Sequence, residues 1–590
     1  MPPCEYTEVI LVEHVRGVCR KTKTVQRIAA LGLLSLIWGT CFAEPVAAKC
    51  DRTVARDLYS SSSKSVRVVV TLDSNPTDAQ AREMQSLGFD VRRHLPIISA
   101  LAGSICQNHL QKLAALPFVK RVSSDDSVRK DDSFTVDHSL ASTAWKQYSA
   151  AGNGIGVAVI DSGIFDGDPD FNTLHSILGI VPIGHRVSAA VDFTGLGVQD
   201  QCGHGTHVGG LIAGDGSQSQ GILNTQTFYG IAPGCSLINV RVLDAKGQGT
   251  VSNVITAVQW CINNAKKYNI RIINLSMGHP VGESYTTDPL CKAVEQAWKS
   301  GIVVVCAAGN GGRLNDDPKA FAPNSGYGTA YWTVESPGND PYVITVGATK
   351  NLDGRRSDDQ IASYSSRGPT VSDCILKPDI IAPGNNVISC EDPNHSYLTT
   401  TYGTEVMIKN SCYQMLGMGY SKAYFCLSGT SMATPVVSGA AALMLQVNPS
   451  LTPDTVKARL MISADKWTDP IGIGDPCTYG AGYLNIPAAI ANKVTASTYA
   501  LSPALELDND GNVYAILDPS IYGQRAMWGT GSDLQGIYGD RAMWGCSSST
   551  AIRNGRAMWG TGGPVNDDGG STSSSSLDLS AKSVLANGDK

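Results

Sequence analysis

The chain has 590 residues, of which 42% are hydrophobic and 17% are charged, and its formal net charge is -6. This composition indicates a globular protein that is long enough to bury a large core and to divide into several segments. The mild acidity excludes the basic surface of a nucleic-acid-binding protein, and no apolar run reaches the ~20 residues of a membrane span, so we expect other proteins as partners.

Residues 1–48 predict a secretory signal peptide. A basic cluster between Arg16 and Arg27 contains no acid, and an apolar run from Ile28 to Ala43 follows it. Small residues suit cleavage after either Ala43 or Ala48. An uncleaved anchor is the alternative, because the stretch before the basic cluster is long for a signal. The preferred interpretation is a secreted protein with no membrane span in its mature form.

The cysteine content agrees with export. Sixteen cysteines suit an oxidising compartment, where disulfide bonds form and persist. Cys306 lies inside the apolar run GIVVVCAAGN, so we expect it to be an unpaired and inert buried thiol.

Residues 50–130 predict a small α+β domain. Strand-like runs (SVRVVVTL, PIISALAGSI and FVKRVSS) alternate with helix-like runs (TDAQAREMQSLG and NHLQKLAAL) between residues 65 and 124. The charged stretch 123–139 then predicts an irregular linker, where a protease could cut.

Residues 138–497 predict a doubly wound α/β domain with a mostly parallel sheet and helices on both faces. Short β-branched runs alternate with longer helical patterns, as a sheet covered on both faces requires. Functional sites in such folds form where strand ends meet helix starts. The expected strands are 156–161, 236–243, 271–276, 302–308 and 342–348, and the expected helices are 250–268, 288–301, 431–447 and 452–463.

Residues 498–590 have a different pattern. The pentapeptide RAMWG occurs at 525–529, 541–545 and 556–560, and a Ser-rich stretch follows. The spacing is that of a repeat of hairpin length, while a low-complexity tail without fixed structure is the alternative. A surface-binding or partner-binding role suits the tryptophans of the repeat.

The α/β domain offers one candidate for each part of a nucleophilic hydrolysis site. Asp161 ends a predicted strand, His204 lies in the Gly-rich run GHGTHVGGLIAG, and Ser431 opens a helix whose first turn includes Pro435. A helix N-terminus offers the oxyanion a backbone donor and a favourable dipole. Asn310, in a loop after a buried strand, can supply a second donor.

At these positions the chain resembles the subtilisin-like serine proteases. The resemblance depends on four motifs in the family's order: IDSGI around Asp161, GHGTHV around His204, AAGN at Asn310 and GTSMATP around Ser431. INLSMG, ASYSSRGPT, KPDIIAPG and GAGYLN add to it, and it covers about residues 140–497. It implies a serine endopeptidase with a Ser-His-Asp triad, made as a zymogen that processes itself, and residues 50–130 resemble the family's inhibitory propeptide.

The resemblance also implies how a protein or peptide substrate binds. Two segments would pair with the substrate backbone, and a third would form a wall of the pocket for the side chain before the scissile bond. Glu335 falls near the expected pocket floor, so we predict a preference for basic side chains. These candidates are Ser276, Met277 and Gly278; Gly247, Gln248 and Gly249; Ala307, Ala308 and Gly309; and Glu335.

Other features leave alternatives open. His207 competes with His204 for the role of base, and we expect it to be structural. Asp166, Asp168 and Asp170 could hold a structural calcium ion, although their spacing is not that of a complete calcium loop. No other cofactor is implied.

Insertions at about 312–335 and 391–425 are expected to cap or reshape the cleft. Two rival functions are a catalytically silent adhesion protein and an acid peptidase with a Ser-Glu-Asp site, which would need a Glu in place of His204.

Overall fold

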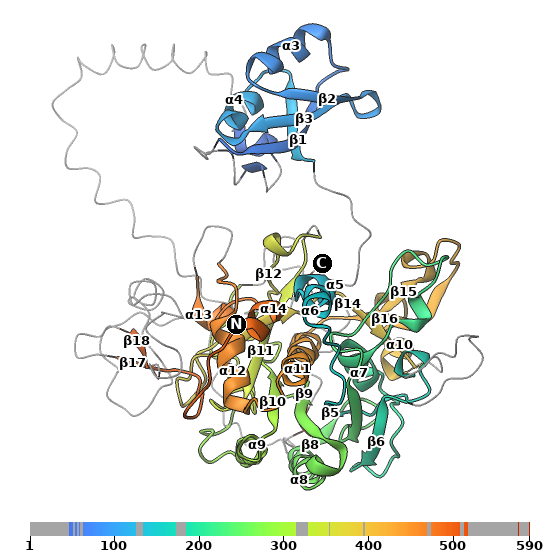
Figure 1. Cartoon of the computed structure of the whole chain (residues 1–590), viewed down its shortest axis with the longest axis vertical. Coiled ribbons are helices and arrows are strands. Elements are labelled where there is room, and N and C mark those ends of the chain that lie inside the picture. Colours follow the sequence, from blue (N-terminus) through green and yellow to red (C-terminus); the bar gives the residue numbers. More distant parts are fainter. Residues whose placement is uncertain are drawn as a thin grey trace, which may run out of the picture. The chain divides into compact units, whose positions relative to one another are not determined.

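The computed structural model describes residues 46–50, 54–55, 58, 63–125, 134–172, 185–313, 328–352, 354–392, 396–468, 474–507, 513–516, 518, 576–577 and 589. The chain forms two compact units, one ending at Arg129 and one beginning at Lys130 (Figure 1). Most of the predicted signal peptide and all three RAMWG repeats lie outside the described residues.

The first unit contains a four-stranded antiparallel sheet in the order β2-β3-β1-β4. One face of β1 is buried, because alternate residues such as Val68 and Val70 pack into a small core with Met84 and Leu110. The sequence missed β2, whose side chains are mostly exposed. The elements are β1 (Ser65–Leu72), β2 (Asp90–Leu95), β3 (Ala100–Cys106), β4 (Val119–Ser124), α3 (Asp78–Ser86), α4 (Leu110–Ala114) and the short helices Val46–Lys49, Pro96–Ile98 and Gln107–His109.

The second unit is built on an eight-stranded sheet. Its order is β12-β11-β10-β9-β5-β7-β6, with β13 also paired to β11. All pairs are parallel except β11 with β12. The strands are β5 (Gly156–Asp161), β6 (Val187–Asp192), β7 (Ser236–Arg241), β9 (Ile270–Leu275), β10 (Val303–Ala307), β11 (Ile344–Lys350), β12 (Gln360–Ile361) and β13 (Ile380–Pro383).

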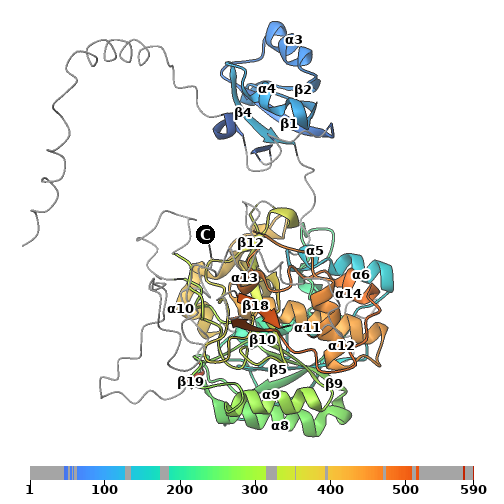
Figure 2. The same ribbon diagram turned by 90° about the vertical axis from the view of Figure 1, so that its left-hand side faces the viewer.

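Helices cover both faces of this sheet, which confirms the predicted doubly wound α/β fold. α8 (Val251–Tyr268) and α9 (Pro289–Lys299) pack on one face, while α7 (His204–Ala213) and α11 (Thr430–Val447) pack on the other (Figure 1 and Figure 2). Side chains fix the helix starts: Thr250 caps α8, and Asp288 followed by Pro289 caps α9. The remaining helices are α6 (Ala141–Tyr148), α12 (Pro453–Ile462), α13 (Pro476–Tyr479), α14 (Ile486–Ala491) and the short helices Pro169–Phe171, Ser217–Ser219 and Arg356–Asp358.

Part of the predicted linker is a helix. β4 extends to Ser124, and α5 (Phe134–His138) begins inside the stretch expected to be irregular. The buried side chain of His138 pairs with Asp359 at 2.6 Å. This long-range contact holds α5 in the second unit, and local composition could not reveal it.

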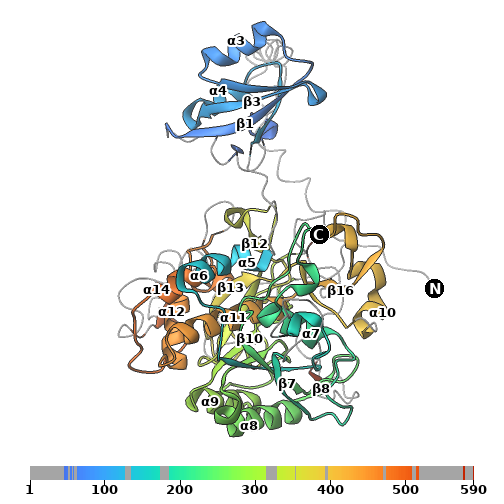
Figure 3. The same cartoon turned by 45° about the vertical axis from the view of Figure 1, so that its right-hand side comes forward.

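The insertion at 391–425 forms structure beside α7 (Figure 3). β14 (Val387–Cys390), β16 (Tyr420–Leu427) and β15 (Met407–Lys409) make an antiparallel sheet in that order. Two backbone bonds tie α10 (Tyr397–Tyr402) to the residues before His204: the Tyr397 N–H donates to Gln201 O at 2.9 Å, and the Leu398 N–H donates to Cys202 O at 3.1 Å. The short helices Gly403–Glu405 and Asn410–Cys412 complete the insertion.

Two further observations concern the core. Cys306 is a buried free thiol, as predicted. Among the described helices, α11 has the length and apolar composition of a membrane span, but 89% of it is buried in this unit. It is the central helix of the core.

Candidate active site

The side chains of Asp161 and His204 form a fully buried pair. β5 ends at Asp161, and α7 begins at His204. The Asp161 Oδ1 lies 2.8 Å from the His204 Nδ1 and also accepts the Ser162 N–H at 2.7 Å. The His204 Nε2 has no hydrogen-bond partner among the described residues. The carboxylate therefore orients the ring and leaves Nε2 available for proton transfer.

Asp200 fixes the start of α7 and was missed by the sequence analysis. Its carboxylate is 1% exposed and accepts bonds from the Ser162 hydroxyl and from the Gly203 and Thr206 N–H groups, all at 2.8 Å. An acidic side chain beside a helix N-terminus satisfies unpaired N–H groups and the helix dipole. Asp200 therefore positions both members of the Asp161–His204 pair. The signal in the sequence was an acid four residues before His204.

Ser431 forms a reciprocal pair of bonds with Ser276. The Ser431 Oγ donates to Ser276 O at 2.9 Å, and the Ser276 Oγ donates to Ser431 O at 2.8 Å. The second bond is needed because Pro435 lies inside α11 and not, as predicted, in its first turn. α11 begins at Thr430, so Pro435 lies beyond the first turn and cannot donate to the Ser431 carbonyl. The Ser276 hydroxyl satisfies that carbonyl instead.

Asn310 follows β10 and faces the start of α11. Its Oδ1 accepts the Thr430 N–H at 3.0 Å and the Thr430 hydroxyl at 3.2 Å, while the Gly309 N–H donates to the same hydroxyl at 3.1 Å. These bonds fix the orientation of the Asn310 amide. The Ser431 N–H lies in the first turn of α11, where N–H groups have no partner within the helix. The orienting role of Thr430 was not predicted.

The predicted substrate segments lie next to these residues. Ser276–Gly278 directly follows β9, and Ala308 and Gly309 directly follow β10, which ends at Ala307. A Cβ added at Gly278 would lie 2.7 Å from the Glu335 Oε2, and one at Gly309 would lie 2.8 Å from the Glu335 Cδ. The structure therefore places the Glu335 carboxylate between two of the predicted segments.

The predicted substrate segment Gly247–Gly249 is a turn that leads into β8 (Gly249–Thr250). The Asp244 Oδ1 accepts the Lys246 N–H at 2.8 Å and the Gln248 N–H at 2.9 Å, which holds the turn through Gly247. A Cβ at Gly249 would lie 2.7 Å from Val242 O. This close backbone approach requires glycine.

His207 is buried on the body of α7, separate from the hydrogen bond between Asp161 and His204. Its Nε2 lies 3.0 Å from Val387 O, and its ring packs edge-on against Phe425. Burial and the neighbouring His204 lower the pKa of His207 to about 3. The geometry agrees with the structural role expected for it.

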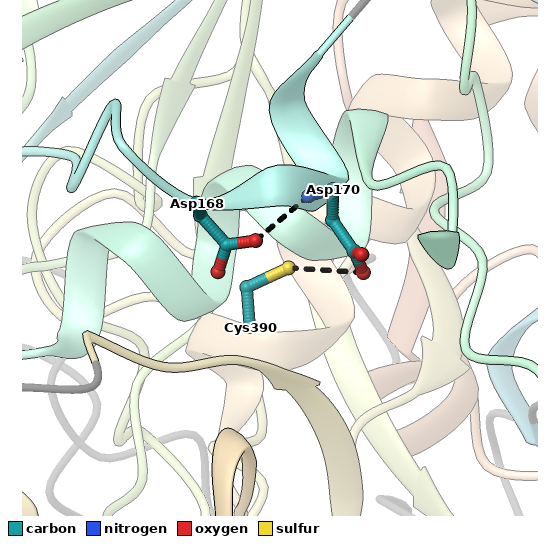
Figure 4. A group of neighbouring side chains, drawn as sticks. All are labelled: Asp168, Asp170 and Cys390. Atoms are coloured by element: carbon teal, nitrogen blue, oxygen red, sulfur yellow. Dashed lines mark hydrogen bonds between the residues drawn. The ribbon is translucent and has the colours of Figure 1, made fainter. Parts of the chain in front are cut away.

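The structure separates the three predicted calcium ligands. Asp168 and Asp170 lie beside the Cys390 thiol (Figure 4), whereas Asp166 is exposed and accepts a bond from Gln199. The Cys390 thiol and the Tyr424 hydroxyl both donate to the Asp170 Oδ2, at 3.7 and 2.6 Å.

Burial raises the pKa of Asp168 well above its usual value, and Asp170 adds to this shift. Calcium needs six to eight oxygen ligands, and a thiol suits softer metals. These residues therefore do not fit a calcium cage.

Comparison with known proteins agrees with this geometry. The family model described as "Subtilase family" matches residues 152–482. "Serine protease AprX" of Bacillus subtilis is 40% identical over 352 residues, covering 58% of this chain and 67% of the relative. "Subtilisin E" of the same species is 30% identical over 405 residues, covering 68% and 83%. "Subtilisin" of Bacillus pumilus is 34% identical over 338 residues, covering 57% and 91%.

Proposed function

Because this chain belongs to the subtilase family, and is therefore a serine-type endopeptidase, we propose that Ser431, His204 and Asp161 form its catalytic triad. The observation that carries the proposal is the buried Asp161–His204 pair at 2.8 Å, whose Nε2 has no hydrogen-bond partner among the described residues. In the proposed reaction His204 takes the Ser431 proton, the Ser431 Oγ attacks the peptide carbonyl, and water hydrolyses the resulting acyl-enzyme.

The contact with Ser276 sets the resting position of the nucleophile. The Ser431 Oγ donates to Ser276 O, so it must leave that carbonyl before it can donate to His204. A substrate strand pairing with Ser276–Gly278 would compete for the same carbonyl. Substrate binding would then favour rotation of the Oγ toward the base, and catalytic hydrogen bonds commonly tighten in this way only in the complex.

The Asn310 side chain and the Ser431 N–H would stabilise the oxyanion. Thr430 holds the Asn310 amide by its oxygen, which directs the nitrogen side of the amide away from Thr430. Such a donor acts best when it is already oriented, because no reorganisation is needed as the charge develops.

Recognition of the substrate would depend first on its backbone. Gly247–Gly249 and Ser276–Gly278 would pair with an extended peptide. The position of Glu335, packed against Gly278 and Gly309, supports the predicted preference for a basic side chain before the scissile bond. Profiling of Arg, Phe and Leu substrates tests this part, and a preference for the apolar ones would contradict it.

We further propose that the enzyme is a secreted zymogen. The α+β unit before Arg129 has the size and elements of an inhibitory propeptide. The basic and apolar pattern of residues 1–48 supports export, and the sixteen cysteines suit an oxidising compartment.

Labelling with a fluorophosphonate tests the triad. Peptide mapping by mass spectrometry should find the adduct on Ser431 of the exported protein, together with loss of the N-terminal segment. A Ser431→Ala variant should show neither. Ser450→Ala is the matched control, because Ser450 is exposed and its hydroxyl bonds to Asn448, beyond the end of α11. A folded protein without an adduct would favour a silent binding protein instead.

A further inference from the structure

Asp589 is buried in a socket formed by residues that are more than 200 positions away in the sequence. Its carboxylate contacts Arg313 at 2.6 Å, Lys350 at 2.9 Å and the Ser363 N–H at 2.7 Å. The Asp589 main chain is held as well, since its N–H donates to the Asn385 Oδ1 at 2.8 Å and its carbonyl accepts from the Asn385 Nδ2 at 3.0 Å. We call Arg313, Lys350, Ser363 and Asn385 the Asp589 socket.

The socket is built for an anion. The side chains of Arg313, Lys350 and Asp589 are 6%, 11% and 5% exposed, so the ion pairs are largely out of water. The Arg313 Nε donates to the Ser363 Oγ at 2.8 Å, and its guanidinium lies over the Tyr364 ring. Burial alone would raise the pKa of Asp589, but Lys350 and the bonds from Ser363 outweigh it and lower the pKa. A buried cation pair without an anion would be costly.

The socket lies beside the candidate active site. Arg313 follows Asn310 by three residues in the loop after β10. Asn385 follows Gly384, whose carbonyl accepts the Gly429 N–H at 2.9 Å. Gly429 directly precedes α11, whose second residue is Ser431. A ligand in the socket is therefore connected to both loops that hold the oxyanion donors.

A second contact comes from the same part of the chain. β19 (Ser576–Leu577) pairs antiparallel with β8, with Ser576 opposite Thr250 and Leu577 opposite Gly249. Gly249 belongs to the segment that would bind the substrate backbone. β19 therefore covers an edge that an extended peptide substrate would need.

We propose that Ser576–Leu577 and Asp589 act together as an intramolecular ligand of the peptidase unit, with Asp589 anchored in the socket and Ser576–Leu577 competing with extended substrates at β8. The ligand class is a peptide with an aspartate that enters the socket by both its carboxylate and its main chain. The competition rests on the proposed function, because it assumes that substrates pair with β8.

The expected size of the effect follows from tethering. A covalent link gives a segment an effective concentration of about a millimolar, so a segment with intrinsic affinity of about 0.1 mM would raise the apparent KM about tenfold. Competition changes KM and leaves kcat unaltered. A substrate too short to reach β8 should not be affected.

The first experiment compares the full chain with a chain ending at Gly570 and with an Asp589→Asn variant. We expect KM for a tetrapeptide anilide to fall about tenfold on truncation and in the same direction for Asp589→Asn, with kcat unchanged. Hydrolysis of a single-residue ester should stay constant, and Asp567→Asn is the matched control. A lower melting temperature with an unchanged KM would overturn the proposal, because it would show only a structural anchor.

The second experiment supplies the segment in trans. A synthetic peptide of residues 571–590 should inhibit the truncated enzyme competitively, and the same peptide with Asp589→Asn should inhibit it more weakly. Equal inhibition by both peptides, or none, would refute the role of the socket. Ester hydrolysis that persists in Ser431→Ala would refute the proposed triad instead, so the two failures are distinguishable.

Discussion

Replacing Asn310 by leucine tests whether its amide stabilises the oxyanion. Leucine has nearly the same shape but no donor, so we expect kcat to fall ~10²–10³-fold, equivalent to ~2.7–4 kcal/mol of transition-state stabilisation. KM for a peptide substrate should change little, because the interaction is made in the transition state rather than in the ground state.

The structure adds a stability cost that must be separated from this effect. The Asn310 Oδ1 accepts two bonds from Thr430, and leucine would leave the Thr430 N–H without that partner. Asn310 is 5% exposed, so losing these bonds should lower the free energy of unfolding by about 1–3 kcal/mol. Thr430→Val removes the Thr430 hydroxyl but keeps the Asn310 side-chain amide, so it should lower kcat much less than Asn310→Leu.

The assay is steady-state hydrolysis of a peptide anilide, with the active enzyme counted by fluorophosphonate titration. The titration removes the contribution of unfolded protein. Asn263→Leu, on the exposed face of α8, is the control and should leave kcat unchanged. A loss smaller than about fivefold for Asn310→Leu would refute the assignment, since it falls well below the effect of removing an oxyanion donor.

Two other predictions concern buried acids. Burial raises the pKa of Glu391 from 4.5 to about 7. Between these two pH values the folded protein keeps the Glu391 proton, whereas the unfolded chain has released it. The contribution of protonated Glu391 to the free energy of unfolding is therefore full below pH 4.5 and is lost as the pH rises through 7. Glu391→Gln should therefore raise the free energy of unfolding by about 3 kcal/mol at pH 8 and by little at pH 4; urea titrations at both values check this, with Glu405→Gln as the exposed control. Chelation with EDTA should leave the melting temperature unchanged, because Asp170 already accepts bonds from Ser217, Gln218 and Tyr424. A fall that calcium alone restores would show that the chain does hold this ion.

Elements with a distinctive local pattern could be predicted from the sequence, together with the proposed catalytic residues at their ends. Buried parallel strands read as apolar runs, so β5 was predicted at its exact bounds, and Asp161 was placed at its end. Polar or peripheral strands were missed for the converse reason. The side chains of β2 and β6 are mostly exposed or half-buried, and their patterns do not differ from those of loops.

Contacts between distant residues could not be predicted. Cys390 lies 220 positions from Asp170, yet the two side chains share a hydrogen bond. The helical pattern gave α11 nearly its full length, but the partner of the Ser431 carbonyl depends on Ser276, which lies 155 positions away. Only the folded sheet brings such pairs together.

The proposed catalytic residues and the elements that contact their loops are therefore specified in different ways in this chain. Asp161, His204, Asn310 and Ser431 all stand at strand ends or helix starts, where short motifs can specify them. Two elements that the motifs do not include contact the loops beside these residues. α10 of the insertion bonds to the backbone just before His204, and the Asp589 socket lies just after Asn310. Because each contacts a loop carrying a proposed catalytic group, substitutions in either element can alter KM without touching the reacting atoms.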